Sequence, residues 1–184
     1  MLFRSGTGMS ALAQYLNGTG KKVTGSDRYF KDGEENQTRV LLEKEGIQCF
    51  PQDGRGITSE LDLVVVSTAV EEDVQEVIQA RSLNIPIIQR SALLSLIIES
   101  RRTIAVGGTS GKSTTSAMIF SILEYAGTSP SIISGAGLVS IMEEGRIGNA
   151  KVGTGQWLIV EADESDRSFL YLLPSIAVVT NIDR

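Results

Sequence analysis

The stretch TIAVGGTSGKSTT, residues 103–115, decides the fold class of this chain. A short apolar strand runs here into a glycine-rich turn, and a lysine followed by hydroxyl side chains then opens a helix. The amides of such a turn can point at phosphate oxygens, and the helix N-terminus adds the positive end of its dipole. Lys112 is then placed to reach the β- and γ-phosphates, and the Ser113 hydroxyl to ligate Mg²⁺. The stretch therefore predicts a loop that binds ATP together with Mg²⁺.

This loop is shorter than the strict pattern G-x-x-x-x-G-K-[ST], because Val106 occupies the place of the first glycine. A glycine-rich turn that carries a surface lysine is the alternative interpretation. The order of strand, turn and helix favours nucleotide binding. The residues predicted to bind ATP are Gly108, Thr109, Ser110, Gly111, Lys112, Ser113 and Thr114.

The composition excludes several classes of function. The chain has 184 residues, a net charge of −5 and no basic run, which argues against nucleic acid as a partner. It contains no histidine, so imidazole cannot serve as a general base or metal ligand within it. The single cysteine, Cys49, suits a reducing cytoplasm. No apolar run is long enough to cross a bilayer, so we expect no membrane insertion.

Strands and helices alternate along the chain, which predicts an α/β fold with parallel strands. Residues 1–100 are predicted to form a Rossmann-like domain, and residues 101–184 the first part of a P-loop domain that binds ATP. The strands expected in the first domain are residues 1–5, 22–26, 47–50, 61–66 and 85–88, with helices after the first turn and at 37–45, 73–84 and 92–100. The second domain is expected to hold strands at 103–106, 131–134, 157–161 and 176–180 and a helix at 112–126.

A second phosphate-binding pattern lies near the N-terminus. Gly6-x-Gly8-x-x-Ala11, with Asp27 further on, fits the fingerprint of dinucleotide-binding domains. The glycines let a pyrophosphate approach the helix start, and Asp27 can accept a hydrogen bond from a ribose hydroxyl. The pattern alone suggests NAD, yet a UDP-sugar also carries a pyrophosphate and satisfies the same chemistry. A turn that serves packing only is the third interpretation.

The strand at residues 157–161 is expected to deliver a carboxylate beside the ATP loop. Its sequence WLIVE is apolar until Glu161, so this carboxylate leaves the core at the carboxyl end of the strand. Carboxylate, hydroxyl and phosphate oxygens are ligands that suit Mg²⁺. We therefore predict Ser113 and Glu161 as metal ligands, and Lys112 and Glu161 as the catalytic residues. Asp166, shortly after, is predicted to belong to a solvated acidic turn.

Six further segments point, together with the ATP loop, to one known family. They are GTGMS (6–10), VTGSD (23–27), VVVSTAV (64–70), IPIIQR (85–90), EADESD (161–166) and IAVVTNI (176–182). The set resembles the Mur ligases, the enzymes that build the peptide stem of peptidoglycan. Folylpolyglutamate synthetases have similar ATP loops. The likeness is greatest to the branch of Mur ligases that joins L-alanine to UDP-N-acetylmuramate.

The resemblance implies an ATP-dependent carboxylate–amine ligase of peptidoglycan synthesis in the cytoplasm. ATP would phosphorylate the carboxylate of UDP-N-acetylmuramate, and an amine would then attack the acyl phosphate. Residues 1–100 would hold the UDP end of this substrate. The contacts that the resemblance implies come from Gly8, Met9, Ser10, Ser26, Asp27, Ser67 and Thr68.

Two departures from the family pattern leave alternatives open. Ser110 stands where the family has histidine or asparagine, and EDVQE at residues 72–76 replaces a more usual Asp-Asn-Pro-Glu. One alternative is a related ligase with another acceptor, such as a murein tripeptide. The others are a nicotinamide-dependent oxidoreductase and a nucleotide-binding protein without catalysis.

The chain ends at Arg184, directly after the apolar strand expected at 176–180. A P-loop domain normally continues with further strands and helices, so we interpret the chain as part of a longer enzyme. The pocket for the incoming amino acid is expected beyond residue 184. We therefore predict that these 184 residues bind ATP weakly or not at all and do not turn over.

Overall fold

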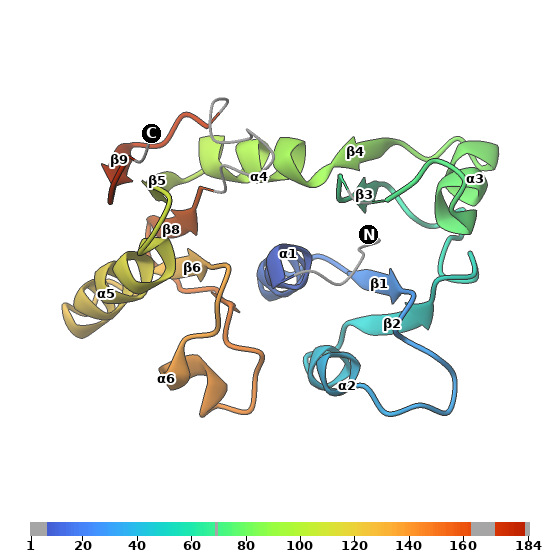
Figure 1. Ribbon diagram of the computed structural model, residues 1–184, viewed down its shortest axis with the longest axis horizontal. Helices are drawn as coiled ribbons and strands as arrows, with labels where there is room; N and C mark the ends of the chain where they lie inside the picture. The colour runs from blue at the N-terminus through green and yellow to red at the C-terminus, as the bar shows by residue number, and fades with distance from the viewer. Residues whose placement is uncertain (1–6, 69, 163–171, 183–184) are drawn as a thin grey trace.

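The computed structural model describes residues 7–68, 70–162 and 172–182. Helices and mostly parallel strands alternate along the chain, which confirms the predicted α/β class (Figure 1). The helices are α1 (Thr7–Gly18), α2 (Gln37–Lys44), α3 (Gln75–Ser82), α4 (Arg90–Glu99), α5 (Lys112–Tyr125) and α6 (Val139–Met142). The strands are β1 (Thr24–Asp27), β2 (Gln48–Pro51), β3 (Val64–Val66), β4 (Ile87–Gln89), β5 (Arg102–Gly107), β6 (Ser131–Ile133), β7 (Ala150–Lys151), β8 (Trp157–Glu161) and β9 (Ile176–Val179).

The first part of the chain holds two short parallel sheets. β1 pairs with β2, and β3 pairs with β4. The strand predicted at 61–66 begins only at Val64, whose partner is Ile87. The residue before that partner is Pro86, which has no N–H to donate, so the ladder does not extend further back. The strand predicted at residues 1–5 lies outside the described residues.

The second part of the chain forms a five-stranded sheet in the order β7-β6-β8-β5-β9. Neighbouring strands are parallel, except β6 and β7, which are antiparallel. β8 has the predicted bounds 157–161, and the side chains of Leu158, Ile159 and Val160 are fully buried. That burial is typical of a parallel strand covered on both faces. The carboxyl ends of β5, β6, β8 and β9 consequently lie along one edge.

The glycine-rich segment 135–155 contains two elements that the sequence does not predict. These are the four-residue helix α6 and the two-residue strand β7. Neither element is long enough for a helical or strand periodicity to appear in the sequence. β7 continues the sheet beyond β6 through the pairs Ile132–Lys151 and Ile133–Ala150. This pairing brings the preceding residue, Asn149, beside the end of β6, where its carbonyl accepts from the Ser134 amide.

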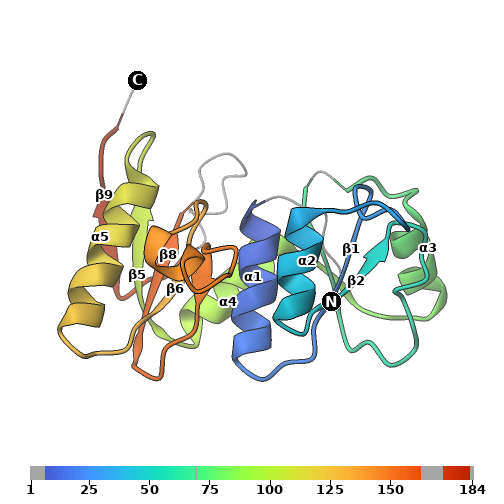
Figure 2. The ribbon, with the colours of Figure 1, turned by 90° about the horizontal axis from the view of Figure 1, so that it is seen from below.

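Helix α1 packs between the first part of the chain and the second sheet. Figure 2 shows α1 between α2 and β6, and α1 contacts both β6 and β7. One buried cluster joins Leu12 and Tyr15 of α1, Leu94 of α4, Ile133 of β6 and Leu158 of β8. A continuous apolar core of this kind excludes water between the elements that share it.

Helix α4 links the two parts of the chain along one side of the molecule (Figure 1). It ends at Glu99, and β5 begins at Arg102, which agrees with a seam near residues 100–101. The division into a sugar-nucleotide domain and an ATP domain at this seam stays a prediction. Within the described ranges, no helix is long and apolar enough to cross a membrane.

Candidate active site

The ATP loop leaves β5 at its carboxyl end and runs directly into α5. Gly111 is the N-cap of α5 with φ 81°, and no side chain caps the helix. Gly108 has φ 129°, and a Cβ at this position would overlap the Thr180 hydroxyl. Both glycines therefore adopt backbone conformations that other residues rarely reach. The first turn of α5 presents its amides and positive dipole end in the way that an anion requires.

Lys112 lies across the loop that it follows. Its Nζ donates to the Gly108 carbonyl oxygen at 2.7 Å, and the side chain is half-buried. The ammonium group thus sits over the turn rather than extending into solvent. The role of Lys112 toward a nucleotide phosphate stays a prediction.

The side chains of the two residues directly after β9, Thr180 and Asn181, brace the same loop. The Asn181 Oδ1 accepts from the Thr109 hydroxyl at 2.8 Å and from the Ser110 amide at 3.1 Å. The Thr180 hydroxyl donates to the Ser110 carbonyl oxygen at 2.6 Å. The sequence analysis did not assign these two residues a role. The available signal was their position at the end of an apolar strand, the same signal that identified Glu161.

Glu161 meets Ser113, as predicted, and also Ser134. The Ser113 hydroxyl donates to Glu161 Oε2 at 3.1 Å, and the Ser134 hydroxyl donates to Glu161 Oε1 at 2.6 Å. Ser134 follows β6, the neighbour of β8, so parallel pairing sets the two residues at one sheet edge. The sequence analysis missed Ser134, although it stands at the end of a predicted strand. Its hydroxyl fixes the carboxylate in the orientation that faces the ATP loop.

The oxygen atoms at and around Glu161 are better ligands for Mg²⁺ than for metals that prefer thiolate or imidazole ligands. Among the described residues no group of three or more His, Cys, Asp or Glu side chains is placed to hold an ion. One carboxylate and two hydroxyls supply hard oxygen ligands, and Mg²⁺ typically completes its shell with phosphate and water. The predicted ligands Ser113 and Glu161 are therefore adjacent, and the metal itself stays a prediction.

Gly8, in the first turn of α1, faces Arg90. A Cβ added to Gly8 would overlap the Arg90 guanidinium, so the backbone and this cation are in close approach. Arg90 is the first residue of α4, directly after β4. The sequence analysis quoted Arg90 only within a family segment and gave it no role. A cation at the carboxyl end of a strand was the signal that pointed to it.

A cavity of about 200 Å³ joins the two predicted phosphate sites. Thr7, Gly8 and Arg90 line it from one side, and Lys112 and Glu161 line it from the other. Leucine and isoleucine side chains form its apolar wall. Two cations, a carboxylate and the starts of two helices therefore converge on one small space, an arrangement suited to a phosphorylated or carboxylated ligand.

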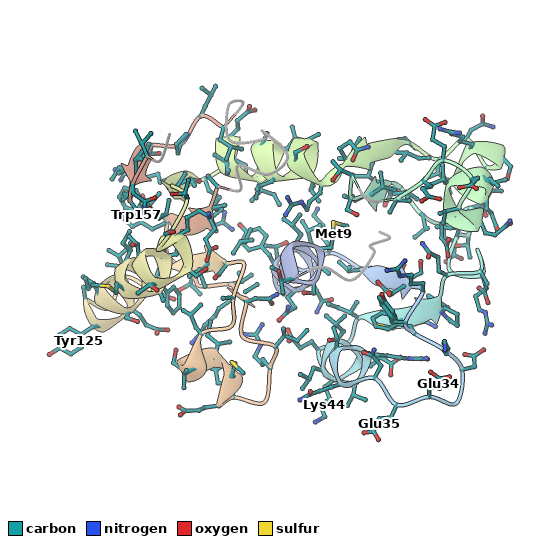
Figure 3. All side chains as sticks on the ribbon, in the orientation of Figure 1. Met9, Glu34, Glu35, Lys44, Tyr125 and Trp157 are labelled. Carbon is teal, nitrogen blue, oxygen red and sulfur yellow. The ribbon has the colours of Figure 1, made fainter. Side chains whose placement is uncertain are left out.

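The residues expected to hold the UDP end differ in exposure. Met9 and Ser10 are buried, and Figure 3 shows the Met9 side chain beside α1 in the interior, whereas Tyr125 projects outward from α5. Ser26 and Asp27, at the end of β1, are fully buried. Their side chains cannot meet a ligand in this conformation without a local rearrangement.

The hydrogen bonds of the β1 end are made within the protein. Ser26 donates to Glu76 Oε1 at 3.1 Å, and Asp27 Oδ1 accepts from the Tyr29 amide at 2.8 Å. Glu76 also accepts from the Gly54 amide at 3.1 Å, and it is fully buried. Glu76 belongs to the segment that departs from the family pattern. It holds the end of β1 against α3, a role that the sequence did not reveal.

Ser67 and Thr68 follow β3 at the same sheet edge. Ser67 is half-buried and Thr68 is exposed. Both remain accessible to a ligand, and their contacts with a sugar nucleotide stay predictions. Asp166 and the rest of its acidic turn lie outside the described residues.

The strand–loop–helix unit on a mostly parallel sheet is the arrangement typical of α/β proteins of the P-loop type. Over residues 2–102 the sequence matches the Mur ligase family, catalytic domain, and the chain belongs to this family. The matched range ends at Arg102, the first residue of β5. The ATP loop lies after this range, so it supports membership of the family independently. The predicted family resemblance is confirmed.

Three similar proteins each match at least 97% of this chain. The UDP-N-acetylmuramate–L-alanine ligase of Carboxydothermus hydrogenoformans is 43% identical over 179 residues, which are 97% of this chain and 36% of that protein. The crystal structure of the UDP-N-acetylmuramate–alanine ligase of Thermotoga maritima matches with a TM-score of 0.85 at 31% identity, over 98% of this chain and 40% of that chain. A murein peptide ligase of Psychrobacter arcticus matches with a TM-score of 0.82 at 25% identity, over 100% of this chain and 43% of that chain. This chain thus spans about a third of the length of the curated relative.

Proposed function

We propose that this chain is the nucleotide-binding part of an ATP-dependent carboxylate–amine ligase of peptidoglycan precursor synthesis in the cytoplasm. Its substrates would be UDP-N-acetylmuramate, ATP with Mg²⁺, and L-alanine. The observation that carries the proposal is the cavity between the Gly8 turn and the Lys112 loop. A ligase of this kind must bring a sugar-nucleotide carboxylate to the γ-phosphate of ATP, and this cavity adjoins both predicted phosphate sites.

The sugar nucleotide would lie along the carboxyl edge of the first two sheets. The start of α1 and the Arg90 guanidinium supply positive charge beside Gly8, where a pyrophosphate can approach the backbone. The carboxylate of the muramyl group would then enter the cavity toward Lys112. Membership of the Mur ligase family favours this interpretation of the glycine turn over NAD.

The phosphates of ATP would replace interactions that the loop now makes within the protein. Lys112 Nζ would exchange the Gly108 carbonyl for the β- and γ-phosphate oxygens. Ser113 and Glu161 would hold Mg²⁺, which neutralises negative charge on the phosphates when bound. Ser134 would keep the Glu161 carboxylate aimed at that position. Phosphoryl transfer depends mainly on such positioning and charge neutralisation.

The reaction would proceed in two balanced steps. A carboxylate oxygen of the sugar nucleotide attacks the γ-phosphorus, and the bond to the β–γ bridging oxygen breaks, so ADP leaves. The amino group then attacks the carbonyl carbon of the acyl phosphate, inorganic phosphate departs, and the nitrogen loses a proton. Lys112 and Arg90 would stabilise the charge that develops in the cavity during the first step.

Three observations bear on the alternatives. Identity is 43% to an L-alanine ligase but 25% to a murein peptide ligase, which favours L-alanine as the added amino acid. Ser110 makes its described contacts through its backbone, so replacement of the usual histidine leaves the loop braced. The cavity adjoins both predicted phosphate sites, which favours a protein that brings two substrates together over one that binds ATP alone.

Thermal unfolding with added ligand tests the assignment of the first site. UDP-N-acetylmuramate should raise the melting temperature of the 184-residue chain, whereas NAD and NADP should leave it unchanged, since a ligand stabilises only the state it binds. Arg90→Gln should reduce the shift, and Arg39→Gln, an arginine on α2 that does not line the cavity, should retain it. Stabilisation by NAD alone would overturn the proposal.

A further inference from the structure

Asn149 is a buried amide that joins the two predicted phosphate sites. It is 1% exposed and lies directly before β7. Its Nδ2 donates to the Thr7 carbonyl oxygen at 2.8 Å and to the Ser10 hydroxyl at 3.0 Å. Its Oδ1 accepts from Gln14 Nε2 at 2.6 Å. The Asn149 side chain therefore holds α1 at three points, two in its first turn and one at Gln14, a turn further along.

The backbone of the same residue leads to the metal carboxylate. The Asn149 carbonyl oxygen accepts from the Ser134 amide at 2.8 Å. The Ser134 hydroxyl donates to Glu161 Oε1, whose other oxygen accepts from Ser113. A continuous path of hydrogen bonds thus runs from the glycine turn through Asn149 and Ser134 to the carboxylate beside the ATP loop.

We propose that Asn149 is a positioning residue that couples occupancy of the sugar-nucleotide turn to the orientation of Glu161. The proposal rests on the proposed function, because it takes the turn before α1 as the diphosphate site. A diphosphate that draws the first turn of α1 toward itself shifts Thr7 and Ser10, the two acceptors of the Asn149 amide. Asn149 transmits the shift to Ser134, since the two residues are paired across β6 and β7. The position of the Ser134 hydroxyl, and with it the orientation of the Glu161 carboxylate, then changes when the acceptor substrate binds.

The residue type suits this task. An amide both donates and accepts, so a single side chain can bond the Thr7 carbonyl, the Ser10 hydroxyl and the Gln14 amide at once. The network also keeps one unused acceptor, because Gln14 Oε1 is buried without a hydrogen-bond partner. A buried network that served only to join two elements would gain by satisfying that atom. Gln14 Oε1 can accept a hydrogen bond from the Asn149 amide when α1 moves and the bonds to Thr7 and Ser10 change.

A second contact between the two parts of the chain provides the matched comparison. Arg146 pairs with Glu45 at 2.9 Å, which ties the segment before β7 to the end of α2. This ion pair has no hydrogen bond to the glycine turn or to Glu161 among the described residues. This ion pair therefore only joins the two parts of the chain. A variant of Arg146 shows how the loss of such a contact by itself changes hydrogen exchange.

Hydrogen exchange with and without UDP-N-acetylmuramate tests the coupling on the 184-residue chain. In the wild type the ligand should slow exchange of the first turn of α1 and, at least threefold, of the Ser134 and Ala136 amides. Asn149→Ala keeps the backbone bond to Ser134 but removes the side-chain link, so the slowing should stay at α1 and vanish at Ser134 and Ala136. Arg146→Gln should behave as the wild type does.

Gln14→Met, which keeps a side chain of similar size, tests the same coupling if Asn149→Ala does not fold. It removes one of the three bonds to the amide, and the slowing at Ser134 should fall to about half. Undiminished slowing at Ser134 in both variants would overturn the inference, as would an equal loss in Arg146→Gln. Absence of ligand protection at α1 in the wild type would instead overturn the proposed function, and the inference with it.

Discussion

The ATP loop and the predicted sugar-nucleotide residues occupy opposite environments. In the loop, Thr109 and Ser110 are exposed, and side chains from neighbouring strands hold their polar atoms in place. At the other site, Ser26 and Asp27 are fully buried and bonded within the protein. The first region is organised for a ligand by side chains that already face it. The second region offers a ligand mainly backbone groups, the N-terminus of α1 and the guanidinium of Arg90.

This difference predicts how each region responds to substitution. Removing a side chain from the ATP loop takes away a direct partner of the ligand. Removing a buried side chain near β1 disturbs packing first and the ligand second. The two sites are therefore best distinguished by substitutions that change the affinity for one nucleotide and leave the affinity for the other unchanged.

The largest expected effect comes from Lys112→Ala. The ammonium donates to the ATP loop, so its loss from the longer ligase that we propose should weaken Mg-ATP binding by about 2–4 kcal/mol. Binding of UDP-N-acetylmuramate should stay the same, and titration calorimetry measures both. Lys44→Ala, an exposed lysine at the end of α2, is the matched control and should change neither affinity. Equal Mg-ATP affinity in wild type and Lys112→Ala would remove the loop from the proposal.

Gly8→Ala tests the backbone-based site with an effect of intermediate size. The added methyl would overlap the Arg90 guanidinium and push it from the turn. Affinity for UDP-N-acetylmuramate should fall by about 1–2 kcal/mol, the size of a charge interaction at a partly buried helix terminus. Alanine favours helix over glycine, so the loss cannot come from a weaker α1.

Mg-ATP affinity is the internal control for Gly8→Ala and should not change. A variant that binds the sugar nucleotide as tightly as the wild type would support the view that this turn serves packing only. The two regions would then no longer form a pair of nucleotide sites.

The sequence could predict those parts of the molecule that depend on local order. The ATP loop needs only strand, turn and helix in succession, and β8 is apolar from end to end, so both were predicted at nearly their observed bounds. The position of Glu161 at the carboxyl end of a buried strand, and that of Ser113 at the start of the helix after the loop, were predictable for the same reason. Their contact at 3.1 Å depends in addition on β8 lying next to β5.

The residues that the sequence analysis missed owe their roles to neighbours far along the chain. Ser134 matters because β6 lies next to β8, and Asn181 because β9 lies next to β5. Strand order does not appear in hydrophobic periodicity. Asn149 belongs to a segment without any period, and only the two-residue strand β7 places it beside α1. The position of Ser134 and Asn181 at a strand end was a local signal, but it did not name their partners, and Asn149 had no such signal for a partner 142 residues away.

The smallest expected effect concerns Cys49, a probe of how closed the first region is. Cys49 lies in β2 and is 4% exposed. Burial raises the pKa of its thiol to about 12, with Glu43 adding to the rise and Arg39 opposing it. At pH 8 only about one thiol in ten thousand is then ionised, so iodoacetamide should label the folded chain very slowly and the unfolded chain readily. Because the raised pKa favours the protonated folded state, the free energy of unfolding should begin to fall as pH rises past 9.0, the ordinary value of the thiol.

Bound UDP-N-acetylmuramate should slow the labelling of Cys49 further, by about twofold, since it stabilises the closed state. Fast labelling of the native chain at pH 8 would mean that the first region opens readily, and its buried residues would then be available to a ligand after all.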